Sequence, residues 1–282
     1  TTLETNAGTV EKEKLKEFRS AGINRLSIGI QSFNDDELKF LTRIHDKKTA
    51  ISTVQSAKEA GFNNISIDLI FNLPGQTKEK WKNNLREAVA LSIQHISAYS
   101  LILERGTILN KLVLDGKVKM QDSDYDADLY EETIYFFENH NFLQYEVSNF
   151  ALKGFECRHN ISYWNYTDYL GFGTSAHSFI ERKRWWNLSS LKMYINAVNN
   201  SGTAIAGEEI IKAEEQLEEF VMLSLRSSGI IKSDLINLFG NQWLKRNELY
   251  LSELEINGFL KIDDETIKLT KKGYSVCDEI LK

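Results

Sequence analysis

The stretch RLSIGIQSF, residues 25–33, predicts a buried β-strand near the start of the chain. An amphipathic segment precedes it, with Val10, Leu15 and Phe18 on one helical face. That segment stops at Gly22, and glycine is a common C-terminal cap of helices. The first thirty residues therefore predict a helix followed by a strand.

The same unit occurs twice more along the chain. A predicted helix over 47–60 leads to a predicted strand over 64–71, and a helix over 77–91 leads to a strand over 95–103. Helices that alternate with strands indicate parallel strands joined by right-handed crossovers. Because these strands are largely apolar, we expect both of their faces to be covered. The first residues of the chain already look like the end of a strand.

From about residue 213 the pattern changes to three helices and a hairpin. The helices are indicated by apolar stripes within 217–225, 235–239 and 249–256. GFLKI at 258–262 and TIKLT at 266–270 flank an acidic turn and predict the hairpin. We therefore expect a first domain over residues 1–207 and a small winged-helix-like domain over residues 208–282. The aromatic, glycine-punctuated stretch 145–178 lies in the first of these.

Composition is ordinary for a globular protein. The chain has 282 residues, of which 42% are hydrophobic and 26% charged, a net charge of −6 and a pI of about 5.5. This charge provides no general case for binding nucleic acid. The two cysteines, Cys157 and Cys277, fit no metal-ligand spacing and indicate free thiols in a reducing cytoplasm. No apolar run approaches the ~18 residues of a membrane helix.

Polar residues stand where successive strands are expected to end. These residues are Glu4, Gln31, Asp68 and Glu104. The carboxyl ends of the strands form the working face of a parallel barrel, so we expect a ligand site there. Chance polarity of loops is the alternative explanation.

Several motifs together resemble one family. They are LETNAGT (3–9), RLSIGIQSF (25–33), LTRIHD (41–46), IDLIFNLPGQT (67–77), CRHNISYW (157–164) and DYLGFGTSAHS (168–178). In this order they resemble the HemW-type family of radical S-adenosylmethionine (SAM) heme chaperones, which is related to oxygen-independent coproporphyrinogen III oxidase. Ala7 stands where the family has proline, and Asn72 where it has glycine. The resemblance implies an α/β fold: an incomplete (β/α)6-type partial barrel followed by a winged-helix-like domain.

The resemblance also implies a SAM pocket. Arg43 would bind the methionine carboxylate, Gln31 and Asp68 the ribose hydroxyls, and Glu4 would lie near the sulfonium and amino end. Ile70 and Ile102 would flank the adenine as apolar walls. Taken singly, Asp68 is equally explained as a turn cap, and Arg43 as a surface charge.

A heme-associated segment is implied around the motif H-N-x-x-Y-W. Its residues are Cys157, His159, Asn160, Tyr163 and Trp164, with His177 as a further candidate. Imidazole and thiolate are both axial ligands of heme iron. A packed loop, in which His159 binds backbone and the aromatic residues are core, is the alternative.

The motif C-x-x-x-C-x-x-C, which holds the [4Fe–4S] cluster in radical SAM proteins, does not occur in this sequence. In the family it precedes the segment that contains Glu4. Two explanations compete, an incomplete chain and a protein that has lost its cluster, and the start at a strand end favours the first. We expect the chain as given to be inactive in radical chemistry, and an intact parent to bind SAM and the cluster.

The function implied is heme binding and delivery of heme to respiratory proteins. Oxygen-independent coproporphyrinogen III oxidase activity is the alternative from another class, and the stretch 157–164 favours the chaperone. A nucleic-acid-binding winged helix is a further alternative. It has Lys268, Lys271 and Lys272 in its favour, but the acidic turn 263–265 would repel phosphate.

Overall fold

The computed structural model describes residues 1–281, and internal contacts divide the chain into two compact units, Thr1–Glu156 and Cys157–Lys282. The first unit is built on a six-stranded sheet with strand order β1-β2-β3-β4-β6-β5. The strands are β1 (Thr2–Asn6), β2 (Arg25–Gln31), β3 (Ile65–Phe71), β4 (His95–Ser100), β5 (Leu143–Glu146) and β6 (Asn149–Ala151). β1 to β4 are parallel, whereas β6 and β5 add an antiparallel hairpin.

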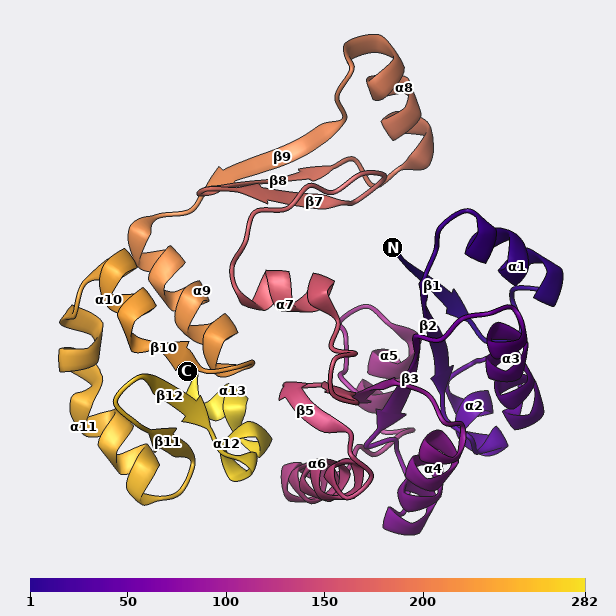
Figure 1. Cartoon of the computed structure of the whole chain (residues 1–282), viewed down its shortest axis with the longest axis horizontal. Helices are drawn as coiled ribbons and strands as arrows, with labels where there is room; N and C mark the ends of the chain where they lie inside the picture. The colour runs from indigo at the N-terminus through magenta and orange to yellow at the C-terminus, as the bar shows by residue number, and fades with distance from the viewer. Residues whose placement is uncertain (282) are drawn as a thin grey trace. The chain divides into compact units, whose positions relative to one another are not determined.

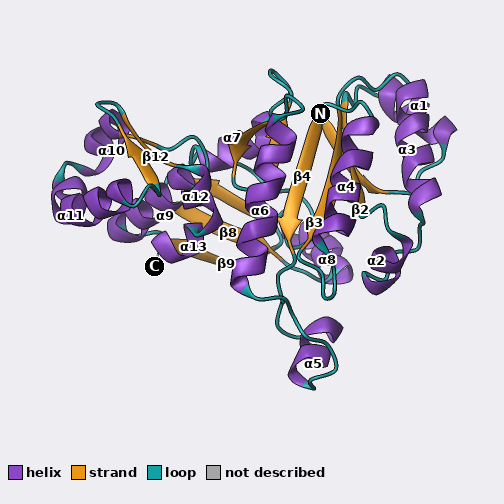
Figure 2. Cartoon of the chain, turned by 90° about the horizontal axis from the view of Figure 1, so that it is seen from below, coloured by secondary structure: helices purple, strands orange, loops and turns teal. Residues whose placement is uncertain are grey.

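The predicted helices α1 (Lys12–Ser20), α3 (Lys47–Glu59) and α4 (Lys78–Ala90) connect the parallel strands. The short helix α2 (Asp35–Phe40), which was not predicted, precedes α3, and α5 (Ile108–Leu114) and α6 (Ser123–Glu138) lie between β4 and β5. Figures 1 and 2 show α1, α3 and α4 on one side of the sheet. The sheet has β1 and β5 at its two edges, so it is an open α/β sheet rather than a closed barrel within residues 1–281.

The two faces of this sheet differ in chemistry. In β2, Leu26, Ile28 and Ile30 are fully buried and point to the face that the helices cover. Their neighbours in sequence, Arg25 and Ser27, point to the other face, which we call the inner face. All seven residues of β2 are buried, so both faces of this strand are covered as expected, but its inner face carries polar rather than apolar side chains.

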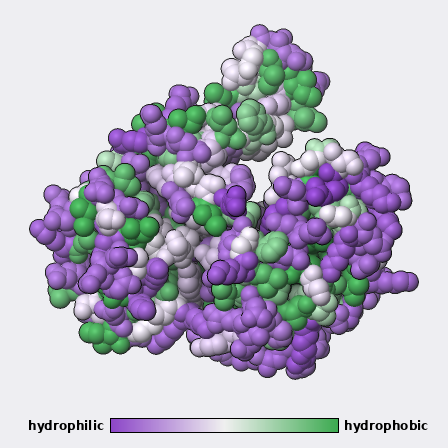
Figure 3. Space-filling view, in the orientation of Figure 1, coloured by the Kyte–Doolittle hydropathy of each residue, from purple (hydrophilic) through white to green (hydrophobic). Residues whose placement is uncertain are grey.

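The second unit begins with α7 (Arg158–Trp164) and a three-stranded antiparallel sheet, β7 (His177–Ile180), β8 (Lys183–Asn187) and β9 (Ile205–Ile210). Helix α8 (Leu191–Ser201) connects β8 to β9. Its side chains Leu191, Met193 and Ile195 are exposed, and Figure 3 shows apolar surface over this helix.

The rest of this unit has the predicted plan of three helices and a hairpin. Its elements are α9 (Ala213–Leu225), β10 (Ile230–Ile231), α10 (Lys232–Phe239), α11 (Gln242–Ile256), β11 (Leu260–Ile262), β12 (Thr266–Leu269), α12 (Lys271–Ser275) and α13 (Cys277–Ile280). The short strand β10, which pairs with β12, and the short helices α12 and α13 after the hairpin were not predicted.

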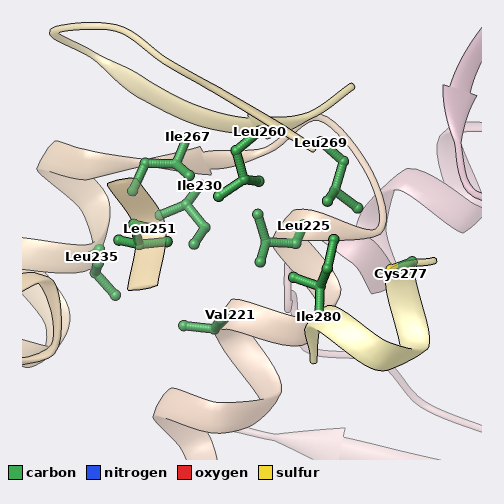
Figure 4. Packing of buried hydrophobic residues seen from close by; sticks show 10 residues of the cluster. All are labelled: Val221, Leu225, Ile230, Leu235, Leu251, Leu260, Ile267, Leu269, Cys277 and Ile280. Carbon is green, nitrogen blue, oxygen red and sulfur yellow. The ribbon is translucent and has the colours of Figure 1, made fainter. Parts of the chain in front are cut away.

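A compact apolar cluster holds these elements together (Figure 4). It consists of Val221, Leu225, Ile230, Leu235, Leu251, Leu260, Ile267, Leu269, Cys277 and Ile280. Burial of this kind contributes roughly 25 cal/mol per Å² of apolar surface. The same burial raises the pKa of the Cys277 thiol to about 11, which makes it unreactive at neutral pH. A domain boundary at 207/208 stays a prediction, because the division into compact units falls at 156/157.

No helix formed by residues 1–281 has both the length and the apolar character needed to span a membrane.

Candidate functional site

A group of polar side chains on the inner face surrounds Gly29 in β2. Gly29 pairs with Asn6 of β1 and with Asp68 of β3. A side chain at Gly29 would have its Cβ 2.8 Å from Gln31 Nε2 and 3.0 Å from Asn6 Oδ1. The two amides therefore meet over the glycine, in space that any other residue would fill.

Gln31 reaches this position through an irregular backbone. It lies at the end of β2 with a φ of +72°, next to a register shift between Gly29 and Gln31. Glutamine rarely adopts this conformation, and such strain is characteristic of functional sites. The buried Gln31 side chain folds back over Gly29.

Arg43 approaches the same group from the loop after α2. Its Nη1 donates to Asn6 Oδ1 at 3.5 Å, while its buried Nε has no hydrogen-bond partner among the described residues. His45 holds this loop against the sheet, because its Nε2 lies 3.0 Å from the carbonyl oxygen of Ile30. The loop thus presents an unsatisfied guanidinium N–H beside Asn6 and Gln31.

Asp68 contributes a carboxylate to the inner face. Burial raises its pKa, while a hydrogen bond with Ser97 lowers it and the negative charge of Glu4 raises it again. Ser27 Oγ donates to Asp68 Oδ1 at 3.4 Å. Glu4 and Asp68 lie in the middle of β1 and β3, so the prediction that they end their strands is wrong. Asp68 bonds across strands and does not cap a turn.

The apolar residues predicted for this site lie at its periphery. Ile70 is half-buried and follows Asp68 on the same face of β3. Ile102 lies in the loop after β4 and is 78% exposed, and Glu104 in the same loop is exposed as well. Asn72, which replaces the family's glycine, has a φ of +60°, a conformation that asparagine tolerates better than most residues.

In the second unit, α7 presents the H-N-x-x-Y-W motif. His159 is exposed, and neither of its ring nitrogens hydrogen-bonds another described residue. Its ring lies edge-on to Tyr163 with centroids 4.8 Å apart, and Tyr163 lies edge-on to Tyr169 at 4.6 Å. Trp164, at the end of the helix, is half-buried.

The other residues predicted to bind heme differ in their accessibility. Cys157 is buried at the start of α7, and its thiol donates to Asn160 Oδ1 at 3.4 Å. His177 is exposed in β7, stacks on Trp186 at 5.8 Å, and has Nδ1 3.0 Å from the carbonyl oxygen of Ser175. Its Nε2 is therefore the nitrogen left for a ligand.

The two aromatic motifs of the second unit are joined. Tyr169 exchanges backbone hydrogen bonds with Phe179 of β7 at 2.8 and 2.9 Å. Gly171 fits closely beside β7, because a Cβ there would lie 2.2 Å from the carbonyl oxygen of His177. The structure therefore links the α7 motif to the strand that bears His177.

Sequence reasoning missed a network on the inner face. His95 Nδ1 lies 2.7 Å from Ser66 Oγ, and its Nε2 lies 2.7 Å from the hydroxyl of Tyr145. Burial, and then the charge of Arg25, lower the pKa of His95 to about 3, so its ring is neutral. Alternating polar residues in three successive strands were the signal for this face: Arg25 and Ser27, Ser66 and Asp68, His95 and Ser97.

Comparisons with known proteins agree with this architecture. Residues 1–88 match the Radical SAM superfamily, and residues 211–276 match the HemN C-terminal domain. The structure superposes on coproporphyrinogen III oxidase (HemN) from Escherichia coli, a radical SAM enzyme, with a TM-score of 0.81. The match covers 99% of this chain and 68% of that one at 24% identity, and it shows the fold alone. The chain is thus of the radical SAM class with a HemN-type C-terminal domain.

Two bacterial relatives narrow the class to a family. The chain is 35% identical to "Heme chaperone HemW" of Bacillus subtilis over 279 residues, 99% of this chain and 74% of the relative. It is 34% identical to the protein of the same name from Lactococcus lactis over 282 residues, 100% of this chain and 74% of that one. The chain belongs to the HemW family, which confirms the resemblance found in the sequence.

Proposed function

We propose that the protein is a heme chaperone that binds heme through His159 and delivers it to respiratory proteins. The observation that carries this proposal is the state of His159, an exposed imidazole with no hydrogen-bond partner among the described residues. It stands on a helix beside the aromatic rings of Tyr163 and Tyr169. One free imidazole beside flat apolar rings fits an axial ligand with a porphyrin plane against it.

The accessibility of the ligands suits release as well as binding. A protein that hands heme to a client needs rapid dissociation, and an exposed site with one strong ligand favours that. Cys157 fits this role less well, because its thiol is buried and already bonded to Asn160. His177, with Nε2 free, is the next candidate.

SAM is the second ligand that we propose, and the residues around Gly29 fit it. The unsatisfied Nε of Arg43 suits the methionine carboxylate, and Asp68 with Gln31 suits the ribose hydroxyls. Glu4 adds negative charge near the cationic end, while Ile70 and Ile102 would flank the adenine. Bound SAM supplies a source of carbon radicals when an iron–sulfur cluster reduces it. The residues of this chain do not fit that cluster, because Cys157 and Cys277 are two buried thiols far apart in sequence.

The SAM site is tested by isothermal titration with S-adenosylhomocysteine, which keeps the carboxylate and the ribose. We expect Arg43→Met to weaken binding at least about tenfold, since truncating one partner of a charge pair costs several kcal/mol. Arg19→Met, which removes an exposed arginine of α1, is the control. Equal affinities for wild type and Arg43→Met would contradict the assignment.

Delivery of heme is tested by transfer. The protein loaded with one equivalent of heme is mixed with an apo b-type cytochrome from a respiratory complex, and the shift of the Soret band is followed. We expect heme to pass to the cytochrome. A protein that binds heme and never releases it would contradict the chaperone function.

A further inference from the structure

Arg25 is a buried cation that forms no ion pair with any residue of the described range 1–281. It begins β2, and only 9% of its surface is exposed. Its Nε has no hydrogen-bond partner, and no carboxylate of residues 1–281 lies within ion-pair distance of its guanidinium. Arg184 shows the usual arrangement, with Glu209 at 2.9 Å and Glu219 at 2.6 Å.

The surroundings of Arg25 do not neutralise its charge. His95 is close enough for the charge of Arg25 to lower its pKa, and both of its ring nitrogens are occupied by Ser66 and Tyr145. The positive charge of Arg25 lowers the pKa of Asp68, but less strongly than burial, the bond with Ser97 and the charge of Glu4 change it. The guanidinium therefore lies among polar side chains of residues 1–281, none of which forms an ion pair with it.

An uncompensated buried charge is expensive to keep. Removing an arginine from water costs several kcal/mol unless hydrogen bonds or an opposite charge offset the loss. A protein can retain such a buried charge where a bound anion neutralises it in the functional, ligand-bound state. The planar fork of the guanidinium, with Nε–H on one edge, matches the two oxygens of a carboxylate.

We propose that Arg25 anchors a carboxylate-binding subsite on the inner face of the sheet, for a small molecule that bears a carboxylate group. Ser27, two residues along β2 on the same face, already donates to Asp68, so the guanidinium of Arg25 is the donor group of this subsite. Arg25 lies six residues before Gln31 along β2, roughly 20 Å at 3.3 Å per residue, so this subsite lies away from the end of the proposed SAM site that Gln31 and Arg43 form, with Asp68 between the two. The inference requires neither heme nor SAM.

A purely structural role for Arg25 is the competing explanation, since the amino-terminal halves of barrel strands commonly serve stability. The two explanations differ in what they expect of Arg25→Met without ligand. A structural arginine would lower the melting temperature when removed, as we expect for Arg184→Met. If Arg25 is retained for a ligand, Arg25→Met should leave the melting temperature unchanged or raise it, because the substitution replaces an unpaired charge with an apolar chain of similar length.

Binding is measured with sodium propionate as the probe, against sodium chloride at equal ionic strength. We expect saturable binding to the wild-type chain, seen as a shift of the Arg25 Nε–H signal in NMR spectra and as a higher melting temperature. Arg25→Met should weaken propionate at least about tenfold, and Arg25→Lys should fall between, because it keeps the charge and loses the fork. Arg19→Met, an exposed arginine of the same unit, should bind as wild type does.

Three results would overturn the proposal. The first is that the wild type shows no saturable binding of propionate or succinate. The second is that it binds phosphate but neither of these two carboxylates. The third is that Arg25→Met lowers the melting temperature as much as Arg184→Met does. Because heme and SAM are absent from these assays, none of these results bears on the proposed chaperone function.

Discussion

At the scale of single residues, Glu146 is a fully buried carboxyl group at the end of β5. It accepts hydrogen bonds from the backbone N–H of Ser148 at 3.1 Å and from the side-chain amide of Asn149. These bonds favour the ionised form, but burial outweighs them and raises the pKa of Glu146 from 4.5 to about 7. The folded protein therefore holds this proton more tightly than the unfolded chain does.

This shift predicts a pH dependence of stability. The contribution of Glu146 is fully present below pH 4.5 and is lost as the pH rises through 7. Relative to Glu146→Gln, which does not titrate, the free energy of unfolding of the wild type should fall by about 2.5 kcal/mol between pH 5 and pH 8. Urea unfolding of both proteins at the two pH values measures this difference. Parallel pH profiles would show that Glu146 titrates normally.

At the scale of elements, a second buried carboxylate ties α2 to the sheet and to the loop before α4. Glu37 accepts from Ser32 Oγ at 2.6 Å, from Asn84 Nδ2 at 2.9 Å and from Gln76 Nε2 at 3.1 Å. Ser32 directly follows Gln31, so this network also holds the end of β2 that carries the proposed ribose ligand.

Loss of this carboxylate should destabilise the first unit. Glu37→Ala leaves the buried side-chain amides of Asn84 and Gln76 without this acceptor, while Ser32 keeps Asn84 Oδ1, and at 1–3 kcal/mol for each unsatisfied group the loss is about 3 kcal/mol. Glu17→Ala removes an exposed carboxylate paired with Lys14 and should change stability by less than about 0.5 kcal/mol. Denaturant unfolding of both variants measures the contrast. Equal losses would mean that the network contributes nothing beyond a surface ion pair.

The elements that the sequence predicted are those with a strong period. The units that end in β2, β3 and β4 were predicted because apolar strands follow amphipathic helices, two of which stop at Gly22 and Gly61. The sheet of β7, β8 and β9 was not predicted, since its strands are short and at least partly exposed, and β8 mixes aromatic with charged residues in the sequence KRWWN. The polar inner face was not predicted. The strands were judged by their high content of apolar residues, and the polar residues that alternate with these, such as Arg25, Ser66 and His95, were not considered.

The candidate sites were predicted to a smaller extent. The resemblance pointed to Gln31, Arg43 and Asp68. In the structure, Gln31 and Arg43 both lie close to Asn6, and Asp68 pairs with Gly29 on the neighbouring strand. The part played by Asn6 was not predicted, because it depends on the register of β1 against β2. The positive φ of Gln31 was equally inaccessible, since the irregularity at the end of β2 is set by tertiary packing.

At the scale of the whole molecule, the apolar cluster of the winged-helix part is self-contained. Every member lies between Val221 and Ile280. We therefore expect a protein of residues 208–282 to fold without the rest of the chain, as a domain with its own core does. Dispersed amide signals in its ¹H–¹⁵N spectrum and cooperative thermal unfolding would support this boundary. Collapsed, overlapping signals would show that the part depends on residues before 208.

The central claim for the whole molecule is that it binds heme through His159, and one titration tests it most directly. Heme is titrated into wild type, His159→Ala, His177→Ala and Cys157→Ser, and the Soret band and the affinity are recorded. We expect one heme per wild-type chain, a shifted band and at least about tenfold weaker binding for His159→Ala, and little change for Cys157→Ser, whose thiol is buried. An unchanged spectrum and affinity for His159→Ala would contradict the assignment, and a wild type that binds no heme would contradict the chaperone function itself.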